Sequence, residues 1–368
     1  MDVQEDIVLE ILSRFPLEQV GKVQALSKFY NKASYHPYYR ALVFQRQRGL
    51  ILDGFLLQTL KSNANILSFV SPRSNDNSRL LDLTLSFLPG RNPQIRAVAP
   101  NGLLLCETRH PSRYNKCFYT ITKLSTKQWK GLPIPKTRFF TQNIAIYILS
   151  SNPLHFKILR LSQDQIPSKR PLPFCYTICE VFDSVSWRWK QLDDIVQDYN
   201  SGSVESHRAP VFAYGSAHWK FSNETSLFTF DFYSQTWSKI ALPDTIINEY
   251  EDIRKSDGFQ RWRTELVEYE GKLGLMREFY GPPALTELWV MEKSNHKGIW
   301  TKKFDFLGSM PMTLYGSDIL VKWLHNKSVM FSSTETEECN CKKLDFASWN
   351  FDPPPRSLNP KTAAKIQL

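Results

Sequence analysis

Six cysteines and seven histidines are the side chains of this chain best suited to bind a metal ion or to act in nucleophilic chemistry. A structural zinc site needs closely spaced pairs of such residues, as in Cys-x-x-Cys. The nearest cysteine pairs here are Cys175 with Cys179 and Cys339 with Cys341, and no histidine adjoins either pair. We therefore predict that the cysteines are buried, reduced thiols in strands, and we expect no metal and no other cofactor.

Motifs for catalysis are also missing from the sequence. The histidines form no His-Glu-x-x-His pattern, and neither a Gly-x-Ser-x-Gly turn nor a glycine-rich phosphate loop occurs. Two acidic runs, residues 249–252 and 335–338, fall in predicted loops, where charges usually face solvent. Carboxylates from distant parts of the chain could still meet as a glycosidase-type pair, but nothing points to one. We predict that the chain has no catalytic residues of its own.

The chain is basic, with a formal net charge of +10, which raises the question of nucleic-acid binding. Its basic clusters include residues 169–170, 261–263 and 302–303, and no known nucleic-acid-binding motif accompanies them. Trp262 between two arginines could stack on a base, but we expect it to be tucked inward at a solvated loop edge. Nucleic acid is therefore not the expected partner. Binding with a steep salt dependence would indicate that alternative, whereas an acidic protein would be attracted electrostatically.

Segments that direct a protein to or through a membrane are not evident. No stretch approaches the roughly 18 consecutive apolar residues of a membrane-spanning helix. The first residues, MDVQED, lack the basic and then apolar profile of a signal peptide. We expect no membrane partner and a location in the nucleus, the cytoplasm or both.

The first forty-odd residues, from Glu5 to Phe44, have the spacing of short amphipathic helices. Pro16 ends the first predicted helix, and His36-Pro37 ends the second. Two or three helices in about 40 residues are too small to fold well unaided, so the rest of the chain or a partner must cover them. Their apolar faces comprise Ile7, Ile11, Leu12 and Phe15 in the first run and Val20, Val23, Leu26 and Tyr30 in the second.

The remainder of the chain is rich in short β-type runs separated by Gly, Pro, Asn and Ser, and helical periodicity is absent after residue 61. A tryptophan repeat decides between a sandwich, a barrel and a propeller. An apolar strand, a polar turn and a tryptophan recur, and the successive tryptophans at positions 129, 189, 237, 300 and 349 are 60, 48, 63 and 49 residues apart. A period near fifty is typical of propeller blades of the kelch type.

Within this repeat, Asp183 and Asp231 each precede a tryptophan by six residues. We expect such a turn residue to bond its own backbone and close the hairpin. Trp129, Trp189, Trp237 and Trp300 should then be part of the blade core.

The predicted fold is a small all-α N-terminal unit of about three helices followed by a large all-β domain, a β-propeller of about six blades. The helical unit spans residues 1–48, a linker or helical connection 49–64, the propeller 65–352, and a disordered tail 353–368.

The N-terminal residues resemble the F-box, the motif by which substrate receptors bind the Skp-type adaptor of SCF (Skp–cullin–F-box) ubiquitin ligases. Residues 11–16, ILSRFP, match the most specific part of the pattern, and residues 26–31, LSKFYN, stand where V-S-K-x-W is usual. Asp6-Ile7 matches the start, and His36-Pro37 begins the closing segment. The resemblance implies that the adaptor is bound mainly through Ile7, Ile11, Leu12, Pro16, Leu17, Val20 and Leu26.

The β-rich remainder resembles the F-box-associated propeller domain of plant F-box proteins. Phrases that carry this likeness are NGLLLC at 101–106, WKGLPIP at 129–135, GSAHWK at 215–220 and LWVM at 288–291. The resemblance implies a non-catalytic substrate receptor that holds an unknown target protein for ubiquitination by the cullin–RING part of the ligase. The alternative is a kelch-like protein-interaction scaffold without ligase function. The insertions Gln163–Phe174 and Thr245–Arg263 are the candidate target-binding loops.

Overall fold

The computed structural model of the chain describes most of the β-rich part and a smaller share of the N-terminal residues. The described residues are 3–15, 22–23, 26–30, 53–61, 64–70, 81–83, 85–99, 102–110, 113–124, 126–137, 139–151, 153–163, 174–198, 204–205, 209–221, 225–255, 262–280, 284–294, 297–307, 313–315, 319–324, 328–333, 342–345 and 364–367.

The N-terminal part begins with helix α1, Val3–Leu12. This is the first predicted helix, but it ends four residues before Pro16, in a turn where the Arg14 amide bonds the Ile11 carbonyl. Such shorter-range bonds are common where an α-helix ends. Residues 22–23, 26 and 28–30 are also helical, while the rest of the predicted helices lies outside the described residues.

Within the described residues, the strands form six antiparallel sheets, numbered here in the order of the chain. Sheet 1 contains β25 (Ala364–Gln367), β1 (Asp53–Lys61), β2 (Ala64–Val70) and β3 (Leu81–Leu83). Sheet 2 contains β4 (Arg91–Val98), β5 (Leu103–His110), β6 (Arg113–Lys123) and β7 (Gln128–Gly131). Sheet 3 contains β8 (Phe140–Ser151), β9 (Leu154–Gln163), β10 (Phe174–Asp183) and β11 (Arg188–Gln191), with β12 (Ile195–Asp198) added to β10.

Sheets 4 to 6 repeat this four-stranded order. Sheet 4 contains β13 (Val211–Ala213), β14 (Ser216–Lys220), β15 (Ser226–Asp231) and β16 (Thr236–Ala241). Sheet 5 contains β17 (Trp262–Tyr269), β18 (Lys272–Phe279), β19 (Leu285–Ser294) and β20 (Lys297–Leu307). Sheet 6 contains β21 (Thr313–Tyr315), β22 (Ile319–Leu324), β23 (Ser328–Ser333) and β24 (Lys342–Asp345).

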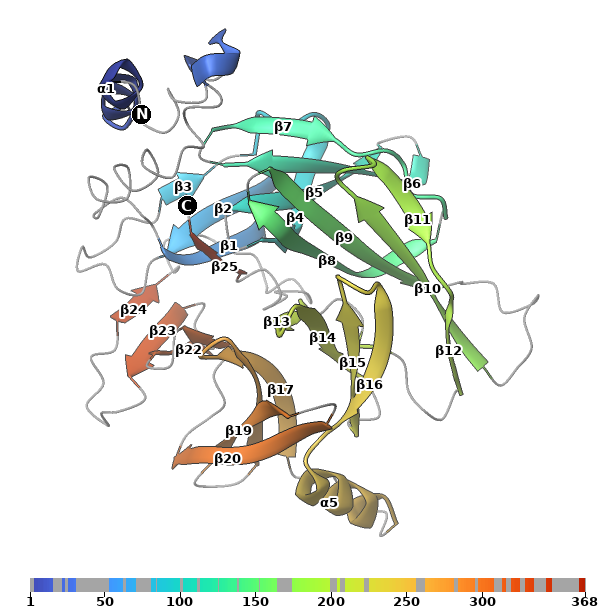
Figure 1. Ribbon diagram of the computed structural model, residues 1–368. Coiled ribbons are helices and arrows are strands. Elements are labelled where there is room, and N and C mark those ends of the chain that lie inside the picture. Colours follow the sequence, from blue (N-terminus) through green and yellow to red (C-terminus); the bar gives the residue numbers. More distant parts are fainter. Residues whose placement is uncertain are drawn as a thin grey trace.

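Sheet 1 is assembled from both ends of the chain (Figure 1). β25 pairs with β1 so that Asp53 lies opposite Gln367 and Leu56 opposite Ala364. Two predictions are therefore wrong. Residues 53–61 are a strand and not part of a linker, and residues 364–367 are not part of a disordered tail. Pairing gives hydrogen-bond partners to the backbone groups along one edge of β1, which would otherwise be an open sheet edge.

The first strands of neighbouring sheets contact each other, which brings these edges toward a common centre (Figure 1). β25 contacts β4, β4 contacts β8, β13 contacts β17, and β17 contacts β21. The apolar core is correspondingly divided into clusters that each join two neighbouring sheets. One cluster, for example, combines Ile121 of sheet 2 with Ile158 of sheet 3, and another combines Leu161 of sheet 3 with Phe228 of sheet 4. The described sheets thus pack side by side in the order of the chain.

The tryptophan repeat marks the fourth strand of a sheet. Trp129, Trp189, Trp237 and Trp300 lie in β7, β11, β16 and β20, while Trp349 lies outside the described residues. In the turns before β11 and β16, the carboxylates of Asp183 and Asp231 accept backbone amides two residues on, as predicted. The residue two before the tryptophan has a positive φ in three of these hairpins: Lys127 at 53°, Trp187 at 53° and Gln235 at 57°.

The environments of these tryptophans differ. Trp189 is buried and donates its indole N–H to the carbonyl of Pro133 at 2.7 Å. Pro133 lies just after β7, the last strand of sheet 2. Trp300 donates in the same way to Ala241, at the end of sheet 4, at 2.9 Å. Trp237 packs against the cluster between sheets 3 and 4. Trp129 is 48% exposed, so the prediction that it belongs to the core is wrong.

Helix α5, Asp244–Lys255, connects sheets 4 and 5, where the sequence predicts a loop. It begins after Pro243, whose carbonyl accepts the Ile246 and Ile247 amides. Ile246 is fully buried, and with Ile247 and Tyr250 it packs on Trp262 and the apolar face of sheet 5. The prediction that helical periodicity ends at residue 61 is therefore wrong. The apolar residues of α5 are few and stand among polar and acidic ones, so their helical spacing is weak in the sequence. None of the helices in the described residues has the length and apolar character needed to cross a membrane.

Candidate functional sites

The N-terminal helices have a small core of their own. Leu9 and Leu12 are buried, and Val8, Phe15, Val23 and Tyr30 pack around them. Among the described residues, this cluster contains no side chain of the β sheets. Ser13 follows the helix and donates its hydroxyl to the Glu10 carbonyl, in the last turn of the helix. The helical unit is thus held together internally.

Outside this core, the helices expose large apolar side chains. The exposed fraction is 54% for Ile7, 51% for Ile11, 78% for Leu26 and 49% for Phe29. Ile7 and Ile11 are four residues apart on α1, so they lie on one face of that helix. Clusters of exposed apolar side chains commonly mark sites where another protein binds.

The seven predicted adaptor-binding residues therefore fall into three groups. Ile7, Ile11 and Leu26 are exposed, while Leu12 is buried in the core of the helical unit. Pro16, Leu17 and Val20 lie outside the described residues. Sequence reasoning missed Phe29, which lies in the helical residues 28–30 and donates its amide to the Ser27 hydroxyl.

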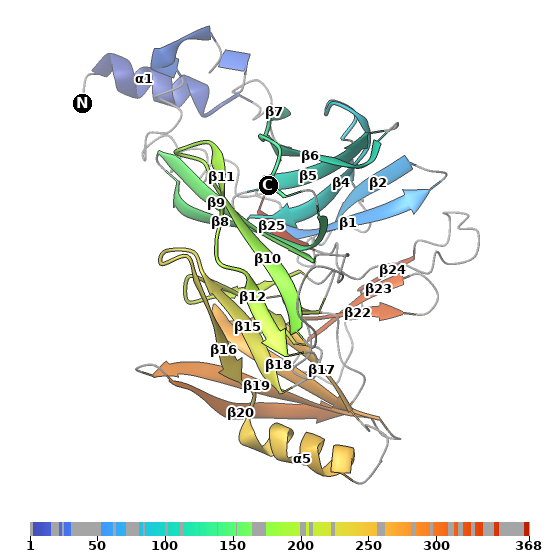
Figure 2. The ribbon, with the colours of Figure 1, turned by 90° about the vertical axis from the view of Figure 1, so that its right-hand side faces the viewer.

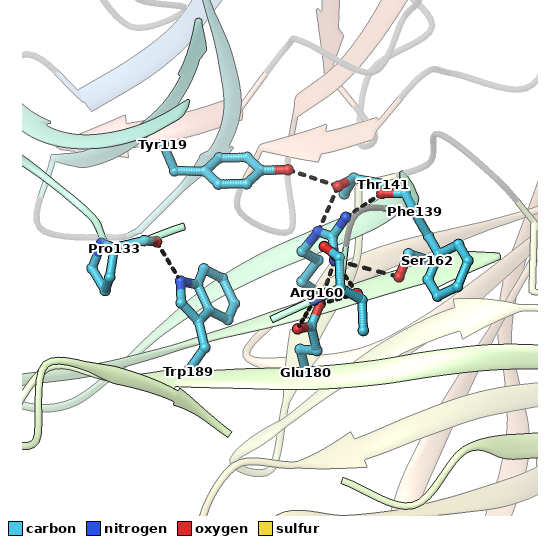
Figure 3. A network of polar contacts seen from close by, with 9 residues as sticks. Tyr119, Pro133, Phe139, Thr141, Arg160, Ser162, Glu180 and Trp189 are labelled. Carbon is cyan, nitrogen blue, oxygen red and sulfur yellow. Dashed lines mark hydrogen bonds and ion pairs between the residues drawn. The ribbon is translucent and has the colours of Figure 1, made fainter. Parts of the chain in front are cut away.

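Polar groups in the β sheets form a network around the cross-strand pair Arg160 and Glu180 (Figure 3). Glu180 is completely buried and accepts an ion pair from Arg160. It also accepts the Thr137 amide at 2.9 Å and the Thr137 hydroxyl at 2.6 Å. The remaining guanidinium N–H groups bond Thr141 at 2.7 Å, the Phe139 carbonyl and other oxygens nearby.

Because every part of this buried pair has a partner, it fixes the segment that crosses from sheet 2 to sheet 3. Tyr119 of sheet 2 extends the network by a hydroxyl contact of 2.6 Å to Thr141. The polar groups of this network are all bonded to one another. We therefore interpret the network as structural: it holds sheets 2 and 3 together through the segment between them.

Other side chains with potential chemistry also have structural roles. Cys106 and Cys179 are buried free thiols, as predicted, and burial raises the pKa of both to about 12, so they stay protonated and unreactive. Burial favours a raised pKa for Asp183, but the Val185 amide and the His155 ring outweigh it and lower that pKa. Within the described residues, no group of three His, Cys, Asp or Glu side chains could hold a metal ion.

The two predicted target-binding insertions leave the sheets at the same end. Turns between first and second and between third and fourth strands lie at one end, here called the hairpin face, and all other connections lie at the opposite end, the loop face. Residues 164–173 link β9 to β10 and residues 242–261 link β16 to β17, so both connections belong to the loop face. Residues 164–173 lie outside the described residues, whereas the second insertion contains α5.

Helix α1 belongs to the opposite side. β1 begins at the hairpin face, because β3 must end at the loop face to lead into β4. The chain therefore enters β1 at the hairpin face, and Figure 2 shows α1 at the upper left of the molecule. The acidic run 249–252 lies on α5 and not in a loop as predicted. Trp262 is buried, as predicted for the basic cluster at 261–263.

Comparison with known proteins now identifies the family. A model of the F-box associated beta propeller domain matches residues 55–342, which span the sheets from β1 to β24. The chain belongs to this F-box-associated β-propeller family. Its resemblance to plant F-box proteins, expected from the motifs, is confirmed by relatives from Arabidopsis thaliana.

Three of these relatives share between 22% and 34% of their aligned residues with this F-box-associated chain. F-box protein At5g49610 is 25% identical over 296 residues, which cover 78% of this chain and 73% of the relative. F-box protein At5g41720 is 34% identical over 161 residues, 43% of this chain and 84% of the relative. F-box/LRR-repeat/kelch-repeat protein At2g27520 is 22% identical over 326 residues, 85% of this chain and 80% of the relative.

Proposed function

We propose that this chain is the substrate-recognition subunit of an SCF ubiquitin ligase. The N-terminal helices bind a Skp-type adaptor, and the β domain binds a target protein so that the cullin–RING part of the ligase can ubiquitinate it. The observation that carries the proposal is a set of exposed large apolar side chains, Ile7, Ile11, Leu26 and Phe29, on a helical unit whose own core is small. These exposed side chains occur in a member of the F-box-associated family, which supports an adaptor as the partner that covers them.

In this proposal the buried Leu12 acts indirectly. It packs against Leu9 in the helical core and so holds Ile7 and Ile11 in place for the adaptor. The exposed side chains fill apolar sites on the adaptor, the usual mode by which an amphipathic helix binds a partner. Pro16, Leu17 and Val20 remain predicted contacts.

The β domain is proposed to be a closed propeller with six blades. Three observations support it: six consecutive sheets in the described residues, contacts between their first strands, and the pairing of β25 with β1. Such a body offers a rigid frame for loops that bind a partner. The proposed target-binding surface is the loop face, which lies opposite to the point where the adaptor-binding helices are attached.

No catalytic residue is needed for this role. A receptor accelerates ubiquitin transfer by holding a target lysine near the charged conjugating enzyme, which raises the effective concentration of the reacting groups. The proposed location is the nucleus, the cytoplasm or both.

Co-expression with a Skp-type adaptor tests the proposal. The double variant Ile11→Asp, Leu26→Asp replaces two of these exposed apolar side chains by charges and should reduce co-purification of the adaptor at least about tenfold. Val185→Asp is the matched control, because Val185 is 75% exposed on a turn of the β domain. It should leave the complex intact. A wild-type chain that is folded and monodisperse but never retains the adaptor would refute the ligase role and favour the scaffold without ligase function.

A further inference from the structure

Sheet 5 contains a second buried arginine at the position equivalent to Arg160. Arg277 lies on β18 opposite Glu287 of β19, as Arg160 lies on β9 opposite Glu180 of β10. The Arg277 side chain is only 2% exposed, and its guanidinium carbon lies 4.7 Å from the ring centre of Trp262 and 4.3 Å from that of Phe279. Contacts of this kind hold the planar cation in a fixed orientation.

Unlike the Arg160 network, the Arg277 site is incomplete. Among the described residues, the Arg277 Nε, the Trp262 Nε1 and the Thr264 Oγ1 are buried without a hydrogen-bond partner. Thr264 lies directly opposite Arg277 on β17. Three unsatisfied polar atoms around one buried guanidinium are costly, and each of them can donate a hydrogen bond. The site therefore lacks an acceptor.

Its charge partners are arranged differently as well. Glu249 of α5 accepts from the Arg277 Nη2, but its side chain is 51% exposed, whereas Glu180 is completely buried. Glu287 is 3.9 Å from the Arg277 Nη1, an ion pair without a short hydrogen bond. Glu249 can rotate into solvent without moving α5, because Ile246 and Tyr250 anchor that helix on sheet 5.

We propose that Arg277 is a binding site for a carboxylate of the target protein, and that Glu249 occupies it until an Asp or Glu side chain of the target replaces it. A carboxylate that accepts from both Nε and Nη2 of an arginine makes two parallel hydrogen bonds. Glu249 is bonded through Nη2 alone, so the incoming group satisfies a donor that Glu249 leaves unpaired.

The surroundings favour a carboxylate over a phosphate. Glu287 lies close to the guanidinium, and its charge repels a dianion more strongly than a monoanion. α5 belongs to a connection on the loop face, where the target is proposed to bind, and the net charge of +10 attracts an acidic protein. The inference rests on the proposed role of the β domain as the target receptor.

Peptide binding to the full chain tests the site, with fluorescence anisotropy as the measurement. The probes are a fluorescein-labelled peptide of six glutamates, the same peptide with six glutamines, and one with phosphoserines. Glu249→Gln frees Arg277 and should tighten binding of the glutamate peptide about tenfold. Asp252→Asn is the matched control, since it removes the same charge from the exposed side of α5 and should change the affinity less than about twofold.

Adding Arg277→Lys to Glu249→Gln should abolish the gain, because an ammonium keeps the charge but lacks the two parallel donors. Equal effects of Glu249→Gln and Asp252→Asn would overturn the proposal, since general charge attraction would explain them. Tighter binding of the phosphoserine peptide would overturn the choice of a carboxylate. Adaptor co-purification is measured on the same variants, so a failure of the ligase role is seen separately from a failure of this site.

Discussion

The tryptophans of the repeat show that the same sequence position can have different energetic roles. Trp189 fills the space between sheets 2 and 3 and donates a hydrogen bond to the Pro133 carbonyl, whereas Trp129 stands half exposed on β7. The difference lies in the packing. Sheet 2 offers Trp189 apolar side chains and a carbonyl, whereas none of the apolar clusters of the described residues includes Trp129.

Replacing these two residues by phenylalanine should separate the roles. Trp189→Phe removes a buried N–H donor and part of the ring, leaves the Pro133 carbonyl without this partner, and should lower the free energy of unfolding by about 1–3 kcal/mol. Trp129→Phe should change it by less than about 0.5 kcal/mol, as is usual for exposed positions. Urea unfolding followed by circular dichroism measures both variants. Equal losses would show that Trp129 is as well packed as Trp189.

At the proposed adaptor-binding site, the sequence could identify the helix but could not say which residues it exposes. Ile7, Ile11 and Leu12 all fit one apolar stripe, because a spacing of three to four residues does not distinguish the two edges of that stripe. The structure divides them: Leu12 packs with Leu9, and Ile7 and Ile11 face outward. Only packing against Val23 and Tyr30 decides this division, and their position relative to α1 is a tertiary property.

Among the elements, those that the sequence predicts best are the hairpins with local signals. The repeat marks the third and fourth strands of sheets 2 to 5, because an apolar strand, a turn and a tryptophan lie within about fifteen residues. β1 and β25 were missed since their pairing joins residues near both ends of the chain, and four residues such as AKIQ carry no strand signal alone. α5 was missed because its apolar residues are few, although Ile246 and Tyr250 are four apart.

The two-residue turns at the hairpin face depend on glycine. Tyr214-Gly215 and Glu270-Gly271 join first to second strands, and all four residues have a positive φ, as type I′ turns require. At Gly271, φ is 73° and an added Cβ would meet no atom within 4 Å. Any cost of a side chain there is therefore backbone strain and not a clash.

Gly271→Ala should accordingly lower the free energy of unfolding by about 1 kcal/mol. Gly131→Ala in β7 is the matched control, because it also meets no atom within 4 Å and lacks the positive φ. It should be neutral or slightly stabilising, since alanine loses less backbone freedom on folding than glycine does. Thermal unfolding of both variants distinguishes the two cases. A neutral Gly271→Ala would mean that the β17–β18 turn tolerates another conformation.

At the scale of the whole molecule, the topology separates the two proposed binding sites. The helices with the proposed adaptor-binding residues join the sheets at the hairpin face, and α5 with Glu249 lies in a connection of the loop face. A target held at the loop face leaves the adaptor site free. Sheet 1 connects the two parts of the chain. Its strand β1 follows the N-terminal helices, and its strand β25 contacts β4 of sheet 2.

Deleting residues 361–368 should test how far the pairing of β25 with β1 stabilises the β domain. The deletion removes β25 and leaves the backbone of β1 from Asp53 to Leu56 without its partner strand. Net contributions of about 0.5–1.5 kcal/mol per hydrogen bond predict a loss of roughly 2 kcal/mol in the free energy of unfolding. The open edge of β1 should also promote concentration-dependent association, which light scattering detects. Removing Leu368 alone, outside β25, is the control and should change neither property. A deletion variant with the urea midpoint and the light scattering of the full chain would show that β25 does not stabilise β1 in solution.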